Sequence, residues 1–521
     1  MSKARLYARN LAANWIGYGA NLAVMFFLSP FVVHALGDTR YGVWSLIMSL
    51  TGYLGLVELG TRAGLGRHIN YYLGKNDIPR VNGIFNTAML MFAAAGILLF
   101  VAAAVLGHFF GTFFPKVPDE LVPRAQWVIL IIAVNVWLGF PGAAFRQVLT
   151  AFDRFDLTNA VDLGVLLIRT AGTVVVLLQG GGLVELAIVQ TVSSAVGVLG
   201  VYAFGKREFP ALTLRPRLAS LPYFRELFGF SIWSFVGSVA MDLLYMTDVI
   251  VIAALLGPEQ VTFYAIGGML IIHMRGLLSQ ATSVLSPQMI KDCAREDYYS
   301  LKNLFQKGST LAMAVSIPIL VGFIFFGKDF IVLWMGPRFA VSYPILLILT
   351  LSQFPTVAFV MGGPIYAGFH KVRLAALVTL LQGVINLGLS LAFVMVWNMG
   401  IQGVAWGTFY PRVAFAFVGG YLALHFARMS LGRFLLAEGW RWLLAIGLFS
   451  AVCWAGASIP VESTWLSFFL RVGAVALLYV PIAWAVLLRR EDKKRLMDYV
   501  ADRLPGRANV KVGRPFDATD K

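Results

Sequence analysis

Several charged side chains lie inside segments of the sequence that are otherwise apolar. These residues are the strongest candidates for binding a ligand. They are Asp162, Arg169, Asp242, Asp248, Arg275, Arg412 and Arg471. A charge at the centre of an apolar helix costs about 3 kcal/mol by insertion measurements, so such a residue usually meets water, a partner charge or a ligand. The planar fork of an arginine can hold two phosphate oxygens and stays ionised in a poorly hydrated place. The arginines therefore indicate an anion-binding site, with Asp242 or Asp248 as the counter-ion of Arg275 when that site is empty.

Two of the apolar segments also carry a stripe of polar residues. In residues 11–35 the stripe consists of Asn14, Tyr18 and Asn21, and residues 228–256 carry Ser231, Ser234, Ser238, Asp242 and Tyr245. Spacings of three and four place each set on one face of a helix. Such a face lines a water-filled cavity or packs against a neighbouring helix, and the sequence leaves both possibilities open.

A third polar face is predicted in residues 157–179, where Asn159, Asp162 and Arg169 lie on one side of the helix. Two interpretations remain for its charges: they face a cavity, or they pair with charges on neighbouring helices. Arg471 lies near one end of its segment, where a long side chain reaches the headgroup region.

The elements that position these residues are long apolar helices. Of the 521 residues, 59% are hydrophobic and 13% are charged, whereas soluble domains carry about a quarter charged residues. The sequence therefore predicts an all-α polytopic membrane protein with fourteen transmembrane helices. These are residues 11–35, 41–61, 82–110, 125–148, 157–179, 183–204, 228–256, 261–284, 307–333, 341–366, 372–397, 401–426, 438–458 and 464–488.

The basic residues predict the orientation of these helices, because Lys and Arg accumulate in cytoplasmic loops. Alternate loops are rich in basic residues, while the opposite set holds only Arg40, Lys116, Arg124, Lys328 and Arg338. Both termini are therefore expected in the cytoplasm, with the protein in the cytoplasmic (inner) cell membrane. Attraction to anionic membrane lipids explains the net charge of +16 without a nucleic-acid partner. The two cysteines, Cys293 and Cys453, provide no disulfide framework or metal cluster.

The sequence contains a weak internal repeat. The stretch from Ala35 resembles that from Leu255, AFDRF from Ala151 resembles GFHKV from Gly368, and GLVELAIV from Gly182 resembles GIQGVAWG from Gly400. The three matches share nearly one offset, so spans 1 to 6 are predicted to recur as spans 7 to 12 in the same orientation.

This repeat predicts two six-helix lobes around a central cleft. The expected parts are an N-lobe (1–205), a cytoplasmic inter-lobe loop (206–227), a C-lobe (228–428), two extra helices (429–488) and a cytoplasmic basic tail (489–521). Spans 4 and 10 are expected to be interrupted, by Pro141-Gly142 and by Gly362-Gly363-Pro364.

The chain resembles a known family in four features. These are two six-helix lobes, two extra helices, a GxxxYG-like turn after the first span, and the stretch ELGTRAGLGRHINYYLGKND from Glu58. It is similar to the polysaccharide flippases of the MOP superfamily, the Wzx-type O-antigen, capsule and teichoic-acid transporters. The resemblance implies a MATE-like fold and transport of a polyprenyl-diphosphate-linked glycan by alternating access. Lipid II flippases carry arginines in spans 1, 2 and 8. Arg275 fits the span 8 position and Arg62 the span 2 position, but span 1 here has none, which disfavours lipid II as the substrate.

The predicted substrate cavity contains Asn14, Tyr18, Asn21, Arg169, Ser234, Ser238, Asp242, Tyr245, Arg275 and Arg412. Arg275, with Arg169 and Arg412 as companions, is expected to bind the diphosphate. No cofactor is expected, the coupling ion (H⁺ or Na⁺) is not specified, and polysaccharide polymerase or assembly proteins are candidate partners. Two alternatives remain: a MATE-like multidrug or cation antiporter, for which Asp242 is the best-placed carboxylate, and a membrane glycosyltransferase, ligase or polymerase, for which the loops are short.

Overall fold

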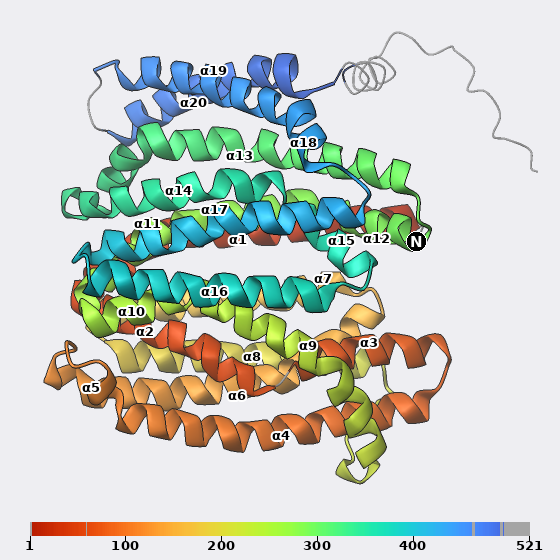
Figure 1. Cartoon of the computed structure of the whole chain (residues 1–521). Helices are drawn as coiled ribbons and strands as arrows, with labels where there is room; N and C mark the ends of the chain where they lie inside the picture. Colours follow the sequence, from red (N-terminus) through yellow and green to blue (C-terminus); the bar gives the residue numbers. More distant parts are fainter. Residues whose placement is uncertain (1–2, 59, 461–463, 490–492, 494–521) are drawn as a thin grey trace, which may run out of the picture.

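The structure, a computed structural model, describes residues 3–58, 60–460, 464–489 and 493. The regular structure of these residues is helical throughout, as the sequence predicts, and the long helices lie side by side (Figure 1). The first half contains α1 (Lys3–Leu36), α2 (Asp38–Gly55), α3 (Thr61–Gly74), α4 (Ile78–His108), α5 (Phe110–Phe113), α6 (Val122–Ala151), α7 (Phe155–Leu178), α8 (Leu183–Glu208), α9 (Leu221–Tyr245) and α10 (Thr247–Leu255). The second half contains α11 (Pro258–Ser283), α12 (Ser286–Ala294), α13 (Tyr298–Met335), α14 (Tyr343–Ala358), α15 (Gly362–Gly368), α16 (Val372–Met395), α17 (Gly400–Phe426), α18 (Leu431–Phe434), α19 (Trp440–Ala457) and α20 (Trp465–Ile482).

Eleven helices in the described ranges are long and apolar enough to cross a membrane, or twelve if the bent pair α9 and α10 forms one span. The predicted spans 41–61 and 401–426 correspond to α2 and α17, which run beside the others but fall outside that set. The exact count of fourteen stays a prediction. Of the predicted tail, 489–521, only residues 489 and 493 are described.

The backbone repeats at the offset expected from the sequence. Gly37 and Gly257 both have positive φ, at 75° and 103°, and each precedes a helix. Asn76 and Glu296 are left-handed at φ 56° and 54°, and the same offset separates them. In each of these two turns the next residue, Asp77 or Asp297, caps the following helix by accepting a hydrogen bond from the backbone N–H three residues on. The repeat is therefore present in backbone conformation where side-chain identity has largely changed.

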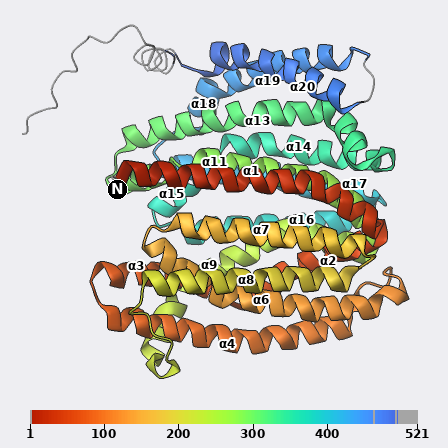
Figure 2. The ribbon, with the colours of Figure 1, turned by 180° about the vertical axis from the view of Figure 1, so that it is seen from behind.

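Helix packing repeats as well. α1 packs on α7 as α9 packs on α16, α4 packs on α6 as α13 packs on α14, and α6 packs on α8 as α14 packs on α17. The last two long helices, α19 and α20, pack on α13 at one edge of the molecule, while α4 runs along the opposite edge (Figures 1 and 2). These pairings agree with two similar six-helix groups, although the division of the chain into lobes stays a prediction.

The connection between the two groups is shorter than expected, because α9 begins at Leu221 rather than near residue 228. Asn82, Asn86 and Thr87 of α4 hold the segment before it, through hydrogen bonds to the backbone of Ala211, Thr213, Arg215 and Ser220. Three buried side chains on one helix therefore fasten the connection to the first group.

Of the two expected interruptions, one is observed. α6 continues through Pro141, because a proline removes one backbone hydrogen bond and a long membrane helix tolerates that loss. The expected break in span 10 is present, since α14 ends at Ala358 and α15 begins at Gly362. A further break at Met246 bends α9 from α10 by 45°, although residues 238–256 around it contain no proline or glycine.

Candidate functional site

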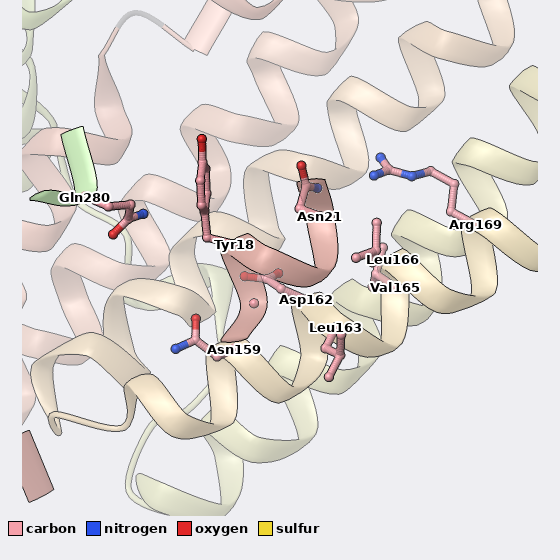
Figure 3. A pocket seen from close by; sticks show the side chains of 10 residues that line it. Tyr18, Asn21, Asn159, Asp162, Leu163, Val165, Leu166, Arg169 and Gln280 are labelled. Carbon is pink, nitrogen blue, oxygen red and sulfur yellow. The ribbon is translucent and has the colours of Figure 1, made fainter. Parts of the chain in front are cut away.

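A cavity of about 490 Å³ lies between α1, α7 and α11. Figure 3 shows its polar side chains, which converge from three helices far apart in the sequence. They are Tyr18 and Asn21 of α1, Asn159, Asp162 and Arg169 of α7, and Gln280 of α11, with Gly17, Leu163, Val165 and Leu166 completing the lining. The sequence predicted Tyr18, Asn21 and Arg169 as cavity residues, and all three line this cavity.

Helical periodicity explains why these residues meet. Asn159, Asp162, Leu166 and Arg169 follow spacings of three and four along α7, so they share the face that packs on α1. The Tyr18 hydroxyl donates a hydrogen bond of 2.7 Å to the His273 carbonyl oxygen of α11, which fixes the ring at the junction of α1 and α11. Gln280, which no sequence pattern singled out, completes the wall because it lies on the α11 face turned toward α1.

Asp162 and Arg169, the two charged residues of α7 that line this cavity, have different environments. Arg146 of α6 donates to both carboxylate oxygens of Asp162, at 2.9 Å and 2.5 Å, so Asp162 pairs with a neighbouring helix. Arg169 forms no hydrogen bond or ion pair within the described residues. It also lines a second cavity of about 230 Å³, together with Thr170, Thr173 and Gln190.

A separate pair of arginines gathers around Tyr245, the last residue of α9. The guanidinium carbon of Arg275 lies 3.9 Å from the centre of the Tyr245 ring, and that of Arg412 lies 5.4 Å from it. Arg412 is only 6% exposed, and the two guanidinium groups are close enough to repel each other. Two guanidinium groups therefore lie on one aromatic ring, and neither forms an ion pair with a carboxylate among the described residues.

Arg169 does not belong to this arginine pair, contrary to the sequence-based expectation. Arg275 and Gln280 are five positions apart on α11, which turns their side chains about 140° from each other at roughly 3.6 residues per turn. Gln280 faces the Tyr18 cavity with Arg169, whereas Arg275 faces Tyr245. The expected single cationic site is therefore two sites on different faces of α11.

The expected counter-ions also lie elsewhere. In the described structure Arg275 forms no ion pair with Asp242 or Asp248. The bend after Tyr245 directs Asp248 into the core, where its Oδ2 accepts hydrogen bonds from Tyr264 at 2.5 Å and Thr408 at 2.7 Å. Its second oxygen is buried without a hydrogen-bond partner among the described residues, and Arg412 is near enough to attract it.

The remaining predicted residues are only partly described. Asp242 is half-buried beside Gly52 of α2, and Ser238 is exposed. The side chains of Asn14 and Ser234 lie outside the described part of the structure. Arg471 pairs with Asp329 of α13 at 2.7 Å and is 15% exposed, while its expected reach to the headgroups stays a prediction.

The two repeat-related turns meet at one end of the bundle, which we call the Asp38 end. The Thr262 hydroxyl donates to the Asp38 carbonyl oxygen at 2.7 Å, and Arg338 pairs with both Asp38 and Glu259. Burial raises the pKa of the Asp38 carboxyl, and the charge of Arg338 opposes this effect. α2 and α11 pack so closely here that a Cβ atom on Gly42 would lie 1.7 Å from the Pro258 carbonyl oxygen.

The opposite end, which we call the Asn76 end, holds a smaller contact between α3 and the start of α9. The Tyr72 hydroxyl donates to Glu226 at 2.7 Å, and His68 Nε2 lies 3.3 Å from the same carboxylate oxygen. The hydrogen bond to Glu226 is the main cause that raises the pKa of Tyr72. Helices of the two groups therefore touch at both ends, with the cavity and the arginine pair between them.

Residues 33–344 match the family model described as "Polysaccharide biosynthesis protein". The chain belongs to this family. Among its relatives, the uncharacterized membrane protein EpsK of Bacillus subtilis is 22% identical over 76% of this chain and 78% of its own length. A putative O-antigen transporter of Shigella flexneri is 18% identical over 76% of this chain and 93% of its own length.

Solved structures confirm the predicted fold class. The lipid II flippase MurJ, in an inward closed conformation, aligns with a TM-score of 0.69 at 15% identity, over 92% of this chain and all of MurJ. An inward-facing multidrug transporter of the MATE family, in the MOP superfamily, aligns with a TM-score of 0.62 at 14% identity, over 78% of this chain and 98% of its own. This polysaccharide biosynthesis protein therefore has the MOP fold.

Proposed function

We propose that this protein is a flippase that moves a polyprenyl-diphosphate-linked oligosaccharide across the cytoplasmic membrane for the synthesis of a cell-surface polysaccharide. The observation that carries the proposal is the arginine pair on Tyr245, beside a separate cavity lined by Tyr18 and amides, in a member of a polysaccharide biosynthesis family. A relative named as a putative O-antigen transporter supports the same substrate class.

The physical demands of this substrate fit the arrangement. A diphosphate-linked glycan has an anionic, hydroxyl-rich head and a long apolar tail, so only the head needs shelter from hydrocarbon. Arg275 and Arg412 supply positive charge for the diphosphate, while Asn21, Asn159 and Gln280 can both donate to and accept from sugar hydroxyls. The two helix groups, residues 1–205 and 228–428, would act as lobes that open alternately at the Asp38 end and the Asn76 end.

Two other activities have less support. An antiporter for organic cations needs a free carboxylate in its cavity, but Asp162 of the Tyr18 cavity is paired with Arg146. Asp248 is held by Tyr264 and Thr408, and Asp242, the best-placed carboxylate in the sequence, lines neither the Tyr18 cavity nor the neighbouring 230 Å³ cavity. A glycosyltransferase, ligase or polymerase needs catalytic groups in a sizeable loop or domain, and the relatives with assigned roles are transporters. The coupling ion, H⁺ or Na⁺, and any polymerase or assembly partner remain to be assigned by experiment.

The function is tested by reconstitution. Vesicles that contain the purified protein should move a polyprenyl-diphosphate disaccharide between leaflets faster than protein-free vesicles, measured by protection of the sugar from an external glycosidase. Cells without the protein should accumulate the same class of lipid-linked glycan on the inner leaflet. Equal rates in both kinds of vesicle would reject the flippase assignment.

The proposed orientation places the Asp38 end outside the cell and both termini in the cytoplasm, because the basic loops lie at the Asn76 end. Cysteines at Asp119 and Lys116 should react with a membrane-impermeant thiol reagent added to whole cells. Cysteines at Asn76 and Asp297 should react only after the cells are opened. The reverse pattern would invert the orientation.

The Tyr18 cavity yields a separate prediction. Asn21→Leu and Tyr18→Leu should each reduce glycan transport about tenfold or more, because leucine removes the Asn21 amide that can bind sugar hydroxyls and the Tyr18 ring on which a sugar can pack. Val175→Leu on α7, a position 51% exposed on the apolar surface, is the matched control and should transport normally. Folded protein is measured by detergent-resistant monodispersity. Normal transport by both cavity variants would mean that this face serves helix packing.

A further inference from the structure

Arg169 lies in the middle of its helix, and no described residue is a partner for its charge. From Arg169, α7 extends about 14 Å to its end at Leu178 and about 21 Å to its start at Phe155, at roughly 1.5 Å per residue. Neither end is close enough for the side chain to reach bulk water easily. Within the described residues Arg169 makes no hydrogen bond or ion pair. A bare charge at this depth is costly, so a guanidinium kept here needs water or an anion beside it.

The side chain is directed into the space where such an anion would fit. Figure 3 shows the Arg169 guanidinium pointing from α7 toward Asn21 of α1. The same side chain lines the 490 Å³ cavity and the neighbouring 230 Å³ cavity, so open space lies on two sides of it. The nearest acid of α7, Asp162, lies two turns away and is occupied by Arg146.

Uncharged groups that suit sugars surround this single cation. Asn21, Asn159 and Gln280 present amides to the cavity. The Tyr18 hydroxyl donates to the His273 carbonyl oxygen, so the Tyr18 ring is available as an apolar surface. Arg169 is the only cation that lines either cavity in the described structure. One planar guanidinium matches a singly charged planar carboxylate, whereas a diphosphate needs the two arginines at Tyr245.

We propose that Arg169 recognises the carboxylate of an acidic sugar, so that the glycan carried by this protein contains a uronic acid or an equivalent carboxylated residue. The inference rests on the proposed flippase function and adds a glycan-selective site to it. The diphosphate occupies Arg275 and Arg412 on one face of α11. The acidic sugar occupies the Tyr18 cavity on the other face, with its carboxylate held by Arg169.

Two matched probes test this inference. One is a polyprenyl-diphosphate disaccharide with a terminal uronic acid, and the other is its methyl ester, which removes the charge with little change of shape. Binding to the purified full-length protein in nanodiscs is measured for each probe. The wild type should bind the acid at least about tenfold more tightly than the ester, since a hydrogen bond between two charged groups is stronger than one between a guanidinium and a neutral ester.

Variants assign the preference to a residue. Arg169→Gln should bring the acid-to-ester ratio close to one, and Arg169→Lys should keep part of it, because lysine retains the charge but loses the fork. Arg275→Gln should weaken the binding of both probes and leave the acid-to-ester ratio of affinities as in the wild type. A wild type that binds both probes equally through Arg275, or an Arg169→Gln variant with the wild-type ratio, would overturn the acidic-sugar site while the flippase function stands. Absence of binding of either probe to the wild type would overturn both.

Discussion

Arg275→Ala should nearly abolish glycan export, with a loss of at least about 30-fold in the rate of transport in vesicles. The guanidinium lies 3.9 Å from the Tyr245 ring and pairs with no carboxylate in the described structure, so its charge is available to the diphosphate. Removing one member of a desolvated, hydrogen-bonded charge pair usually costs about 2 kcal/mol or more, which corresponds to this factor. The measurement is the initial rate of disaccharide transfer between leaflets.

The matched variants separate charge from geometry. Arg275→Lys should retain more activity than alanine, and Arg412→Ala should reduce transport as well, since both arginines share the Tyr245 ring. Arg471→Ala is the control, because that arginine of α20 pairs with Asp329 of α13, away from Tyr245. If Arg275→Ala and Arg412→Ala both transport at the wild-type rate, the arginine pair does not bind the diphosphate.

The fold could be predicted from the sequence because its determinants are local. A run of apolar residues fixes a membrane helix, and a residue that must adopt positive φ fixes the turn between two helices. Gly37 and Gly257 show this directly, since each glycine begins the same kind of turn at equivalent positions of the repeat. The capping aspartates Asp77 and Asp297 recur at the same offset, although no match at these residues entered the sequence argument.

The candidate site could be predicted only in part, because it depends on how helices rotate against one another. Periodicity places Asn159, Asp162 and Arg169 on one face of α7, but it does not reveal that Arg146 of α6 neutralises Asp162. It also does not reveal which face of α11 meets α1, so Arg169 and Arg275 were expected together. The break at Met246 has no proline or glycine to mark it, and this break turns Asp248 away from Arg275 and into the core.

The close packing at the Asp38 end leads to the second prediction with a large expected effect. Gly42→Ala should reduce transport about a hundredfold, because the new Cβ would overlap the Pro258 carbonyl group, at 1.7 Å from its oxygen and 2.5 Å from its carbon. Backbone atoms cannot move aside as a flexible side chain can, so α2 and α11 must separate. Overpacking costs up to about 3 kcal/mol. This energy disfavours by about a hundredfold the conformation in which the Asp38 end is closed.

The separation of α2 from α11 can be measured apart from transport. Thr262 is fully buried against the Asp38 carbonyl oxygen, so a cysteine at this position should be protected from an impermeant thiol reagent in the otherwise unchanged protein. In the Gly42→Ala background the same cysteine should react from outside the cell. Gly55→Ala, at the other end of α2, is the matched control, because no described atom outside its own helix backbone and chain neighbours lies within 4 Å of the added Cβ. A reactive Thr262 cysteine together with normal transport in Gly42→Ala would show that α2 and α11 need not touch during the transport cycle. The Asp38 end would then have to close through Arg338, Asp38 and Glu259 alone.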